Sequence, residues 1–341
     1  MKKPAQIDIA VLLIFFTRTT TLKRTFSAIR EARPTRLFLY QDGPRNDEEA
    51  KKIEMAKQIV NDNNIDWDCE VVRNYHTENS GAWASNFKAH QWAFDMADKC
   101  IVLEDDSTPS LSFIPFCKEM LDRYENDYRV TMISGFNFEE KSNNIPYDYF
   151  FSTVFSIWGW ASWRRVVKHW EIGYPVVDDS FNMRQLESLV KEHQGRKEML
   201  DKLKKHKKAN KPIYESLFWT YNTLNSGLAV TPTVNLISNT AVSEESAHFQ
   251  LSLKTMPRRM RQLLTMSTFD LTFPLRHPKY VIENVEYKQR ASKIMAWGHP
   301  WIKIGRSFEE LLLYIRYADF RRICEAVIHR FRKITGNFNY M

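Results

Sequence analysis

Three consecutive carboxylates follow directly on an apolar run of the sequence. The apolar residues 101–103 are followed by Glu104, Asp105 and Asp106, which we call the acidic triplet. Adjacent acids repel one another, so holding three together requires a compensating cation. Carboxylate oxygens suit Mn²⁺ or Mg²⁺, which commonly bridge protein carboxylates to a phosphorylated substrate. An acidic turn exposed to solvent is the alternative, and placement after a buried strand favours the metal site.

The residues up to the acidic triplet alternate between strand-like and helix-like patterns. Strands are predicted at residues 7–16, 36–40, 68–72 and 100–103, separated by helices at 19–33, 47–61 and 83–98. One of the threonines at positions 19–21 is expected to cap the first helix. Such alternation predicts a largely parallel sheet with helices on both faces. Ligands of such sheets bind beyond the carboxyl ends of the strands, where the acidic triplet would emerge.

After residue 112 the pattern becomes mixed. Helices are predicted at residues 113–124, 191–211 and 213–224, and strands at 130–134, 150–157 and 227–230. The composition changes near Gln250, and the chain shows no internal repeat and no long low-complexity linker. We therefore expect a catalytic or binding body, residues 1–249, followed by a largely helical C-terminal extension, residues 250–341.

Positive charge is concentrated in the C-terminal extension. The whole chain carries a net charge of +8, of which residues 250–341 contribute +10 and residues 1–249 contribute −2. Apolar and basic residues alternate at helical spacing over residues 302–331, a pattern suited to a membrane interface rich in anionic lipid. Packing against the body or against a second subunit is the alternative, and a homo-oligomer stays open.

Composition limits the class of protein. Hydrophobic residues make up 43% of the 341 residues and aromatic residues 13%, which excludes global disorder. No apolar run approaches the roughly 20 residues of a membrane span. The longest, Ile9–Phe16, is followed by no small-residue cleavage site, which favours a buried strand over a signal peptide. The four cysteines show neither metal-binding nor disulfide spacing, so we expect a cytoplasmic protein.

Several short motifs occur in an order typical of one enzyme family. Leu103–Asp106, continuing through Pro109 and Phe113, resembles the Glu-Asp-Asp form of the DxD motif in GT-A glycosyltransferases. The nearest resemblance is to the N-acetylglucosaminyltransferase I group and its bacterial surface-polysaccharide relatives. Other segments that resemble the family are Phe16-Thr17-Arg18, Gln41-Asp42-Gly43, His90-Gln91-Trp92-Ala93, the Gly-Trp block at residues 159–165, and Asn235-Leu236-Ile237-Ser238-Asn239. Together they cover roughly residues 7–249.

The resemblance implies the GT-A fold, a Rossmann-like mixed and mainly parallel α/β sheet flanked by helices. By the same resemblance Asp106 binds the metal, Mn²⁺ or Mg²⁺, while Asp105 faces the ribose and Glu104 the sugar. Arg18 and Asp42 correspond to residues that contact the nucleotide, Arg18 by charge and Asp42 by hydrogen bonds to the base.

Three further residues receive roles from the resemblance. His90 belongs to the helix before the metal motif and is expected on the cofactor side. His248 is expected to contact the metal or the diphosphate, although the glycines of the family's loop are replaced here. Tyr214-Glu215 stands where relatives carry Trp-Asp, which makes Glu215 the candidate general base. Glutamate offers the same chemistry on a side chain longer by one methylene.

The resemblance implies a metal-dependent, inverting glycosyltransferase of the hexosyl- or N-acetylhexosaminyltransferase class. It would move a sugar from a nucleotide-diphosphate donor, a UDP-sugar above all, to a glycan or lipid-linked acceptor in cell-surface polysaccharide synthesis. A sugar-nucleotide nucleotidyltransferase is an alternative, against which the absence of glycine from residues 16–22 counts. A third hypothesis is a non-enzymatic protein that binds nucleic acid or another polyanion. The acidic triplet counts against it, because binding a polyanion does not require three adjacent carboxylates without a metal. The expected location is the cytoplasm, including the inner face of the membrane.

Overall fold

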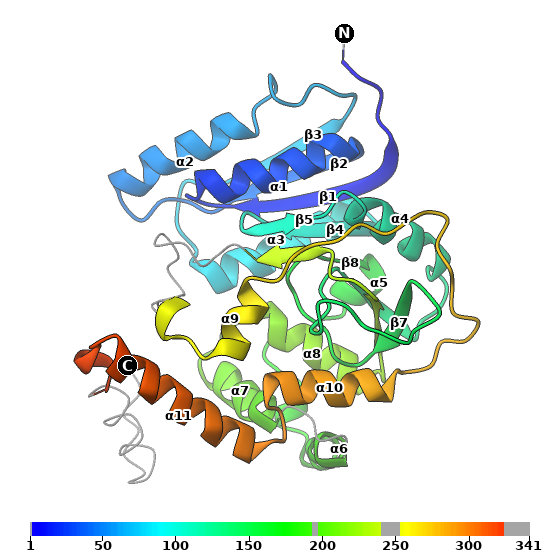
Figure 1. Cartoon of the computed structure of the whole chain (residues 1–341). Helices are drawn as coiled ribbons and strands as arrows, with labels where there is room; N and C mark the ends of the chain where they lie inside the picture. Colours follow the sequence, from blue (N-terminus) through cyan, green and yellow to red (C-terminus); the bar gives the residue numbers. More distant parts are fainter. Residues whose placement is uncertain (1, 193–196, 240–252, 324–341) are drawn as a thin grey trace.

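The computed structural model describes residues 2–192, 197–239 and 253–323, which form a large mixed sheet and a small two-stranded sheet with helices around them (Figure 1). The strand order in the large sheet is β3-β2-β1-β4-β8-β6-β9-β7, and the small sheet pairs β5 with β10. The strands are β1 (Ile7–Phe15), β2 (Pro34–Gln41), β3 (Glu70–Tyr75), β4 (Lys99–Glu104), β5 (Ser107–Pro109), β6 (Val130–Ser134), β7 (Tyr149–Ser152), β8 (Trp160–Trp163), β9 (Leu228–Pro232) and β10 (Ile237–Asn239).

The first four strands of the large sheet are parallel, as the sequence predicts. β1 pairs with β2 on one side and with β4 on the other, and β2 pairs with β3. The apolar run of β1 is buried from Ile9 to Phe15 because helices cover both faces of the sheet. The expected fold class, a Rossmann-like and mainly parallel α/β sheet flanked by helices, is confirmed.

The second half of the sheet mixes strand directions. β8 lies antiparallel between β4 and β6, β9 runs parallel to β6, and β7 closes the edge antiparallel to β9. The sequence did not predict β8 as a strand, although it falls in the Gly-Trp block. Its two tryptophans, Trp160 and Trp163, are buried in the core. The strand expected at residues 150–157 is shorter than predicted and ends at Ser152.

Gly159, which precedes β8, permits both a left-handed backbone and close packing. Its φ is +60°, and a Cβ atom added there would lie 2.4 Å from Cδ1 of the buried Ile237. We expect Gly159→Ala to lower the free energy of unfolding by about 3 kcal/mol, through backbone strain and overpacking together. Gly173→Ala is the matched control: its φ is +85° with no atom within 4 Å, so only the strain of about 1 kcal/mol applies. Denaturant unfolding of both variants measures the difference, and equal losses would contradict the packing account.

Two groups of helices cover opposite faces of the sheet (Figure 1). In one, α1 packs against α2 and α4, and in the other α3 packs against α5 and α8. The helices of the body are α1 (Thr19–Ala32), α2 (Asp47–Ile59), α3 (Ala82–Met96), α4 (Phe113–Arg123), α5 (Arg164–Val167), α6 (Ser180–Glu192), α7 (Lys197–Lys208) and α8 (Tyr214–Leu224), with a 3-10 turn η1 (Pro175–Val177).

Two predictions about helices are wrong in detail. Of the single charged helix predicted at residues 191–211, α7 covers residues 197–208, and α6, which ends at Glu192, was not predicted. The N-cap of α1 is Arg18 rather than a threonine, and its side chain makes no capping bond. A guanidinium has no acceptor for the helix N–H groups, and that of Arg18 instead contacts the acidic triplet.

Residues 253–323 contain η2 (Leu253–Thr255), α9 (Arg258–Leu264), α10 (Val285–Met295) and α11 (Pro300–Arg316). The segment between α9 and α10 follows the body closely. The backbone N–H of Phe269 donates to the carbonyl of Asn235, and Arg276 forms an ion pair with Asp148. The division between body and C-terminal extension stays a prediction, but the described part of the extension up to α10 is fastened to the body at both ends.

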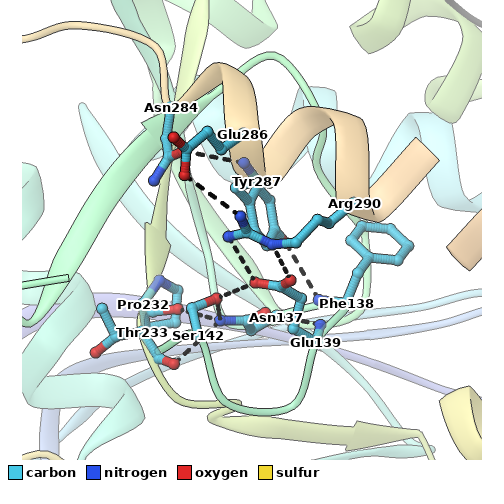
Figure 2. Close-up of polar contacts among 10 residues, drawn as sticks. All are labelled: Asn137, Phe138, Glu139, Ser142, Pro232, Thr233, Asn284, Glu286, Tyr287 and Arg290. Atoms are coloured by element: carbon cyan, nitrogen blue, oxygen red, sulfur yellow. Dashed lines mark hydrogen bonds and ion pairs between the residues drawn. The ribbon is translucent and has the colours of Figure 1, made fainter. Parts of the chain in front are cut away.

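Helix α10 is attached to the loop after β6 through polar contacts (Figure 2). Tyr287 accepts a hydrogen bond from the backbone N–H of Phe138 at 3.1 Å. Arg290 donates from Nε to Oε1 of Glu139 at 2.5 Å, and Ser142 donates to Oε2 of the same carboxylate at 2.6 Å. Glu139 therefore links α10 to the body through an ion pair with Arg290 and a hydrogen bond from Ser142.

The amphipathic pattern predicted over residues 302–331 corresponds only in part to one helix. α11 ends at Arg316, and Ala318 adopts a left-handed conformation with φ of 52°, which breaks the helix. Residues beyond 323 lie outside the described part of the chain. Across the described ranges, none of the helices combines the length and the apolar character that a membrane span requires.

Candidate active site

The carboxyl ends of three parallel strands meet at one edge of the sheet. Phe15 at the end of β1 lies beside Gln41 at the end of β2, and Ile14 lies beside Glu104 at the end of β4. Residues that follow these ends in the chain are therefore neighbours in space. The edge collects Arg18, Asp42 and the acidic triplet, as the alternating pattern of the sequence predicts.

Arg18 binds two members of the acidic triplet. Its Nη1 donates to Oδ1 of Asp105 at 3.0 Å and to Oδ2 of Asp106. Asp105 also accepts from the backbone N–H of Phe16 at 3.0 Å. Asp105 and Asp106 are only 5% and 7% exposed, so water stabilises their negative charges little, and the guanidinium of Arg18 stabilises them instead. The sequence interpretation assigned Arg18 to the nucleotide, and in the structure its contacts are with the triplet.

Removing the charge of Arg18 should destabilise the protein. We expect Arg18→Met to lower the free energy of unfolding by about 3 kcal/mol, because it leaves two buried carboxylates without their counter-charge. Arg36→Met is the control, since Arg36 pairs with the exposed Glu70 and such pairs contribute less than about 1 kcal/mol. Denaturant unfolding of both variants tests the comparison. A loss no larger than that of the control would show that Arg18 is not needed to neutralise the triplet.

Glu104 is held by a tyrosine that the sequence interpretation did not assign to the site. The hydroxyl of Tyr214, the first residue of α8, donates to Oε1 of Glu104 at 2.8 Å. Burial, followed by the charges of Asp106, Asp105 and Glu215, raises the pKa of Glu104, and the Tyr214 bond opposes the shift. Burial and Asp106 likewise raise the pKa of Asp105, against the lowering effect of Arg18. The edge therefore carries more negative charge than Arg18 neutralises.

Glu215 belongs to the same electrostatic cluster as the acidic triplet. It lies in the first turn of α8, next to Tyr214, and its charge acts directly on Glu104. More than one hundred residues separate Glu215 from the triplet in the sequence. The packing of α8 against α3 thus adds a fourth carboxylate to the edge.

Asp42 is placed by the loop that leads into α3. Both of its carboxylate oxygens accept from the backbone N–H of Ser80, at 3.0 and 3.2 Å. The preceding residue, Gln41, is fully buried, and neither polar atom of its side chain has a hydrogen-bond partner among the described residues. The end of β2 thus presents a fixed carboxylate beside a buried amide.

The two histidines predicted for the site have different outcomes. His90 is fully buried among aromatic rings, with its ring centroid 4.5 Å from that of Tyr214 and 5.3 Å from that of Trp160. Burial lowers the pKa of His90 to about 3, so the ring is neutral at physiological pH. It packs against Tyr214 with no exposed surface, and its expected contact with the cofactor stays a prediction. His248 lies outside the described residues.

The donor set of this edge fits a hard divalent cation. All four acidic side chains offer oxygen ligands. Burial, and after it the charges of neighbouring acids, raises the pKa values of Glu104 and Asp105. Over the described ranges, no three histidine, cysteine or acidic side chains converge as a ready-made metal site. Mg²⁺ and its analogues are commonly held by one or two carboxylates together with substrate phosphates, which agrees with this arrangement.

The chain resembles several solved structures remotely. The mannosyltransferase PcManGT from Pyrobaculum calidifontis, in complex with GDP-Man and Mn²⁺, is 11% identical with a TM-score of 0.33, over 49% of this chain and 48% of that one. Mouse xyloside xylosyltransferase 1 is 12% identical over 48% and 69% of the two chains, with a TM-score of 0.30. A UDP-glucose pyrophosphorylase complexed with UDP-glucose is 8% identical over 48% and 81%, with a TM-score of 0.29. The sequence matches no protein-family model and no curated protein. Identities of 8–12% with TM-scores of 0.29–0.33 assign no function to this chain.

Proposed function

We propose that the protein is a metal-dependent, inverting glycosyltransferase that uses a nucleotide-diphosphate sugar, a UDP-sugar above all. The observation that supports this most directly is the meeting of Arg18, Asp42, the acidic triplet and Glu215 at one edge of the sheet. In this proposal Asp42 and Asp105 bind the base and the ribose, Asp106 binds the cation that contacts the diphosphate, and Glu215 is the carboxylate that accepts a proton.

In this proposal the chain orients the donor through the ends of its first, second and fourth strands. Asp42, fixed by the N–H of Ser80, accepts hydrogen bonds from the nucleotide base. Asp105 faces the ribose, and Asp106 is the metal ligand. The metal, when bound, neutralises charge that develops on the departing diphosphate.

The proton is handled by Glu215. An acceptor hydroxyl must lose its proton as it attacks the anomeric carbon of the donor sugar, and a positioned carboxylate accelerates such a step by about 10²–10⁴. Glu104 faces the sugar, and Tyr214 keeps it in place through their hydrogen bond. Attack from the side opposite the diphosphate gives inversion at the anomeric carbon. The acceptor is a glycan or a lipid-linked glycan.

The proposal is tested with a panel of nucleotide sugars in the presence of Mn²⁺. Binding to the folded state raises the melting temperature, so a thermal-shift screen identifies the donor before the acceptor is known. The identified donor is then incubated with the protein, and the nucleotide product is analysed. Release of the nucleoside diphosphate supports glycosyl transfer or hydrolysis. Formation of a nucleoside triphosphate from the donor and pyrophosphate would instead identify a nucleotidyltransferase, and the absence of any donor shift would contradict both activities.

A further inference from the structure

A strongly basic pocket of about 870 Å³ lies between α9, α10 and α11, away from the acidic triplet in the sequence. Five of its lining residues are basic and two are acidic, which leaves a net charge of +3. The basic residues are Arg258, Arg259, Arg290, Lys293 and Arg306, and the acidic ones are Glu139 and Glu309. We call this the basic pocket.

The two acids of the basic pocket already have partners. Glu139 accepts from Arg290 and Ser142, as Figure 2 shows for the wall formed by α10. Glu309 accepts from the backbone N–H of Arg258 at 2.7 Å. Glu139 is thus paired with Arg290, while Glu309 binds a neutral N–H and its charge acts on Arg306, so the two acids offset only part of the basic charge of the pocket.

Arg306 is fixed within the pocket beside another cation. Its guanidinium donates to the carbonyl of Ile294 and to the sulfur of Met260, which fastens α11 to α10 and α9. Burial and then the positive charge of Arg259 lower the pKa of Arg306. Cations held close together in this way favour a multivalent anion, and guanidinium groups suit phosphate in particular.

An apolar stripe runs along α11 next to the basic pocket. Its side chains recur every three or four residues and are between 45% and 81% exposed: Trp301, Ile304, Phe308, Leu312 and Ile315. The pocket-lining residues Ile302, Gly305 and Glu309 each follow a stripe residue directly in the sequence. Consecutive helical positions are about 100° apart, so the two faces adjoin along the helix.

We propose that the basic pocket binds the phosphate group of an anionic membrane phospholipid while the apolar stripe of α11 enters the membrane interface. An amphipathic helix of this kind buries its apolar face roughly 5–10 Å into the boundary between headgroups and acyl chains. A phosphate at that depth would meet the arginine and lysine side chains of the neighbouring face. The inference is independent of the proposed transferase activity, since neither Glu215 nor the acidic triplet takes part.

The combination of the two features favours a lipid over other occupants. A soluble phosphate would bind in the basic pocket but leave the five apolar side chains of the stripe exposed to water. A second copy of the chain would cover the apolar stripe but bring its own positive charge to the pocket. An anionic membrane satisfies both faces at once.

The test measures flotation of the full chain with vesicles of phosphatidylcholine alone and with vesicles that also contain phosphatidylglycerol. We expect binding only to the anionic vesicles. Arg259→Gln/Lys293→Gln changes two exposed pocket residues and should weaken binding about 25-fold, at about fivefold for each positive charge. Trp301→Gln/Phe308→Gln should weaken it at least roughly tenfold. Arg24→Gln/Lys51→Gln, with the same loss of charge from exposed positions on α1 and α2, should bind as the unaltered protein does.

Each contrary outcome overturns the inference in a recognisable way. Equal loss in the Arg24/Lys51 control would mean that overall charge, and not the pocket, attracts the membrane. Binding of inorganic phosphate by calorimetry, lost in the Arg259/Lys293 variant but without vesicle binding, would assign the pocket to a soluble phosphate. A dimer that the Trp301/Phe308 variant dissociates, again without vesicle binding, would assign the stripe to contact between copies. None of these measurements involves turnover, so they do not depend on the transferase proposal.

Discussion

Asp106→Ala is expected to lower metal-dependent turnover of the nucleotide-sugar donor by at least about 10³-fold. A bound divalent cation contributes several kcal/mol of charge stabilisation to a transition state, and about 4 kcal/mol corresponds to a factor of 10³ in rate. The fold should survive, because Asp105 keeps its contacts with Arg18 and with the N–H of Phe16. Removal of one of the mutually repelling acids also relieves part of the charge that raises the pKa of Glu104. The measurement is nucleoside diphosphate release with and without Mn²⁺, alongside thermal unfolding.

A matched control separates loss of a ligand from loss of an ion pair. Asp127 pairs with Arg129 at 2.7 Å before β6, at the opposite edge of the sheet. Asp127→Ala removes the same side chain from another aspartate–arginine ion pair, a more exposed one, and turnover should be unchanged. Mn²⁺-dependent turnover at the ordinary rate in Asp106→Ala would refute the assignment of the metal ligand.

Glu215→Gln is expected to lower the rate of transfer strongly while donor binding persists. The amide keeps the size and hydrogen-bonding capacity of the side chain but cannot accept the proton of the attacking hydroxyl. The expected loss in kcat is about 10²–10⁴. Because the base acts on the acceptor, the thermal shift produced by donor and Mn²⁺ should remain.

The control for this variant occupies the equivalent position of another helix. Glu286 lies in the first turn of α10, as Glu215 does in α8, and its side chain is exposed. Glu286→Gln should leave both donor binding and transfer intact. If Glu215→Gln transfers sugar at the ordinary rate, the general base must be sought elsewhere at the same edge.

The first half of the fold was predictable because its signals are local. The uninterrupted apolar runs of β1 and β4 identify buried parallel strands, and the acidic triplet directly after β4 identifies a strand end. Asp42 follows β2 in the same way. For these residues the position in the sequence determines the position in the sheet, so the edge of the site could be placed without coordinates.

Other features depend on contacts between distant segments. The four residues of β8 form a strand because they pair with β4 on one side and β6 on the other. A segment of four residues is too short for a pattern of alternating apolar and polar residues to predict a strand. The bond of Tyr214 to Glu104 and the packing of His90 behind it require α8 to lie beside α3. Arg18 could be placed at the site, but its contacts with Asp105 and Asp106 depend on the burial of these two carboxylates, which the sequence does not show.

The contacts of residues 269–290 with the body bear on the order in which the chain folds during synthesis. Strands β1 to β4 pair only with one another and with β8, so this part can assemble as soon as residue 163 has emerged from the ribosome. β7, in contrast, pairs with Glu283, which lies just before α10, and the loop after β6 receives Tyr287 and Arg290 from α10. That side of the sheet cannot be completed until the last quarter of the polypeptide has been synthesised. In a nascent chain stalled near residue 250, β7 and the loop after β6 would be exposed to proteases and prone to aggregation.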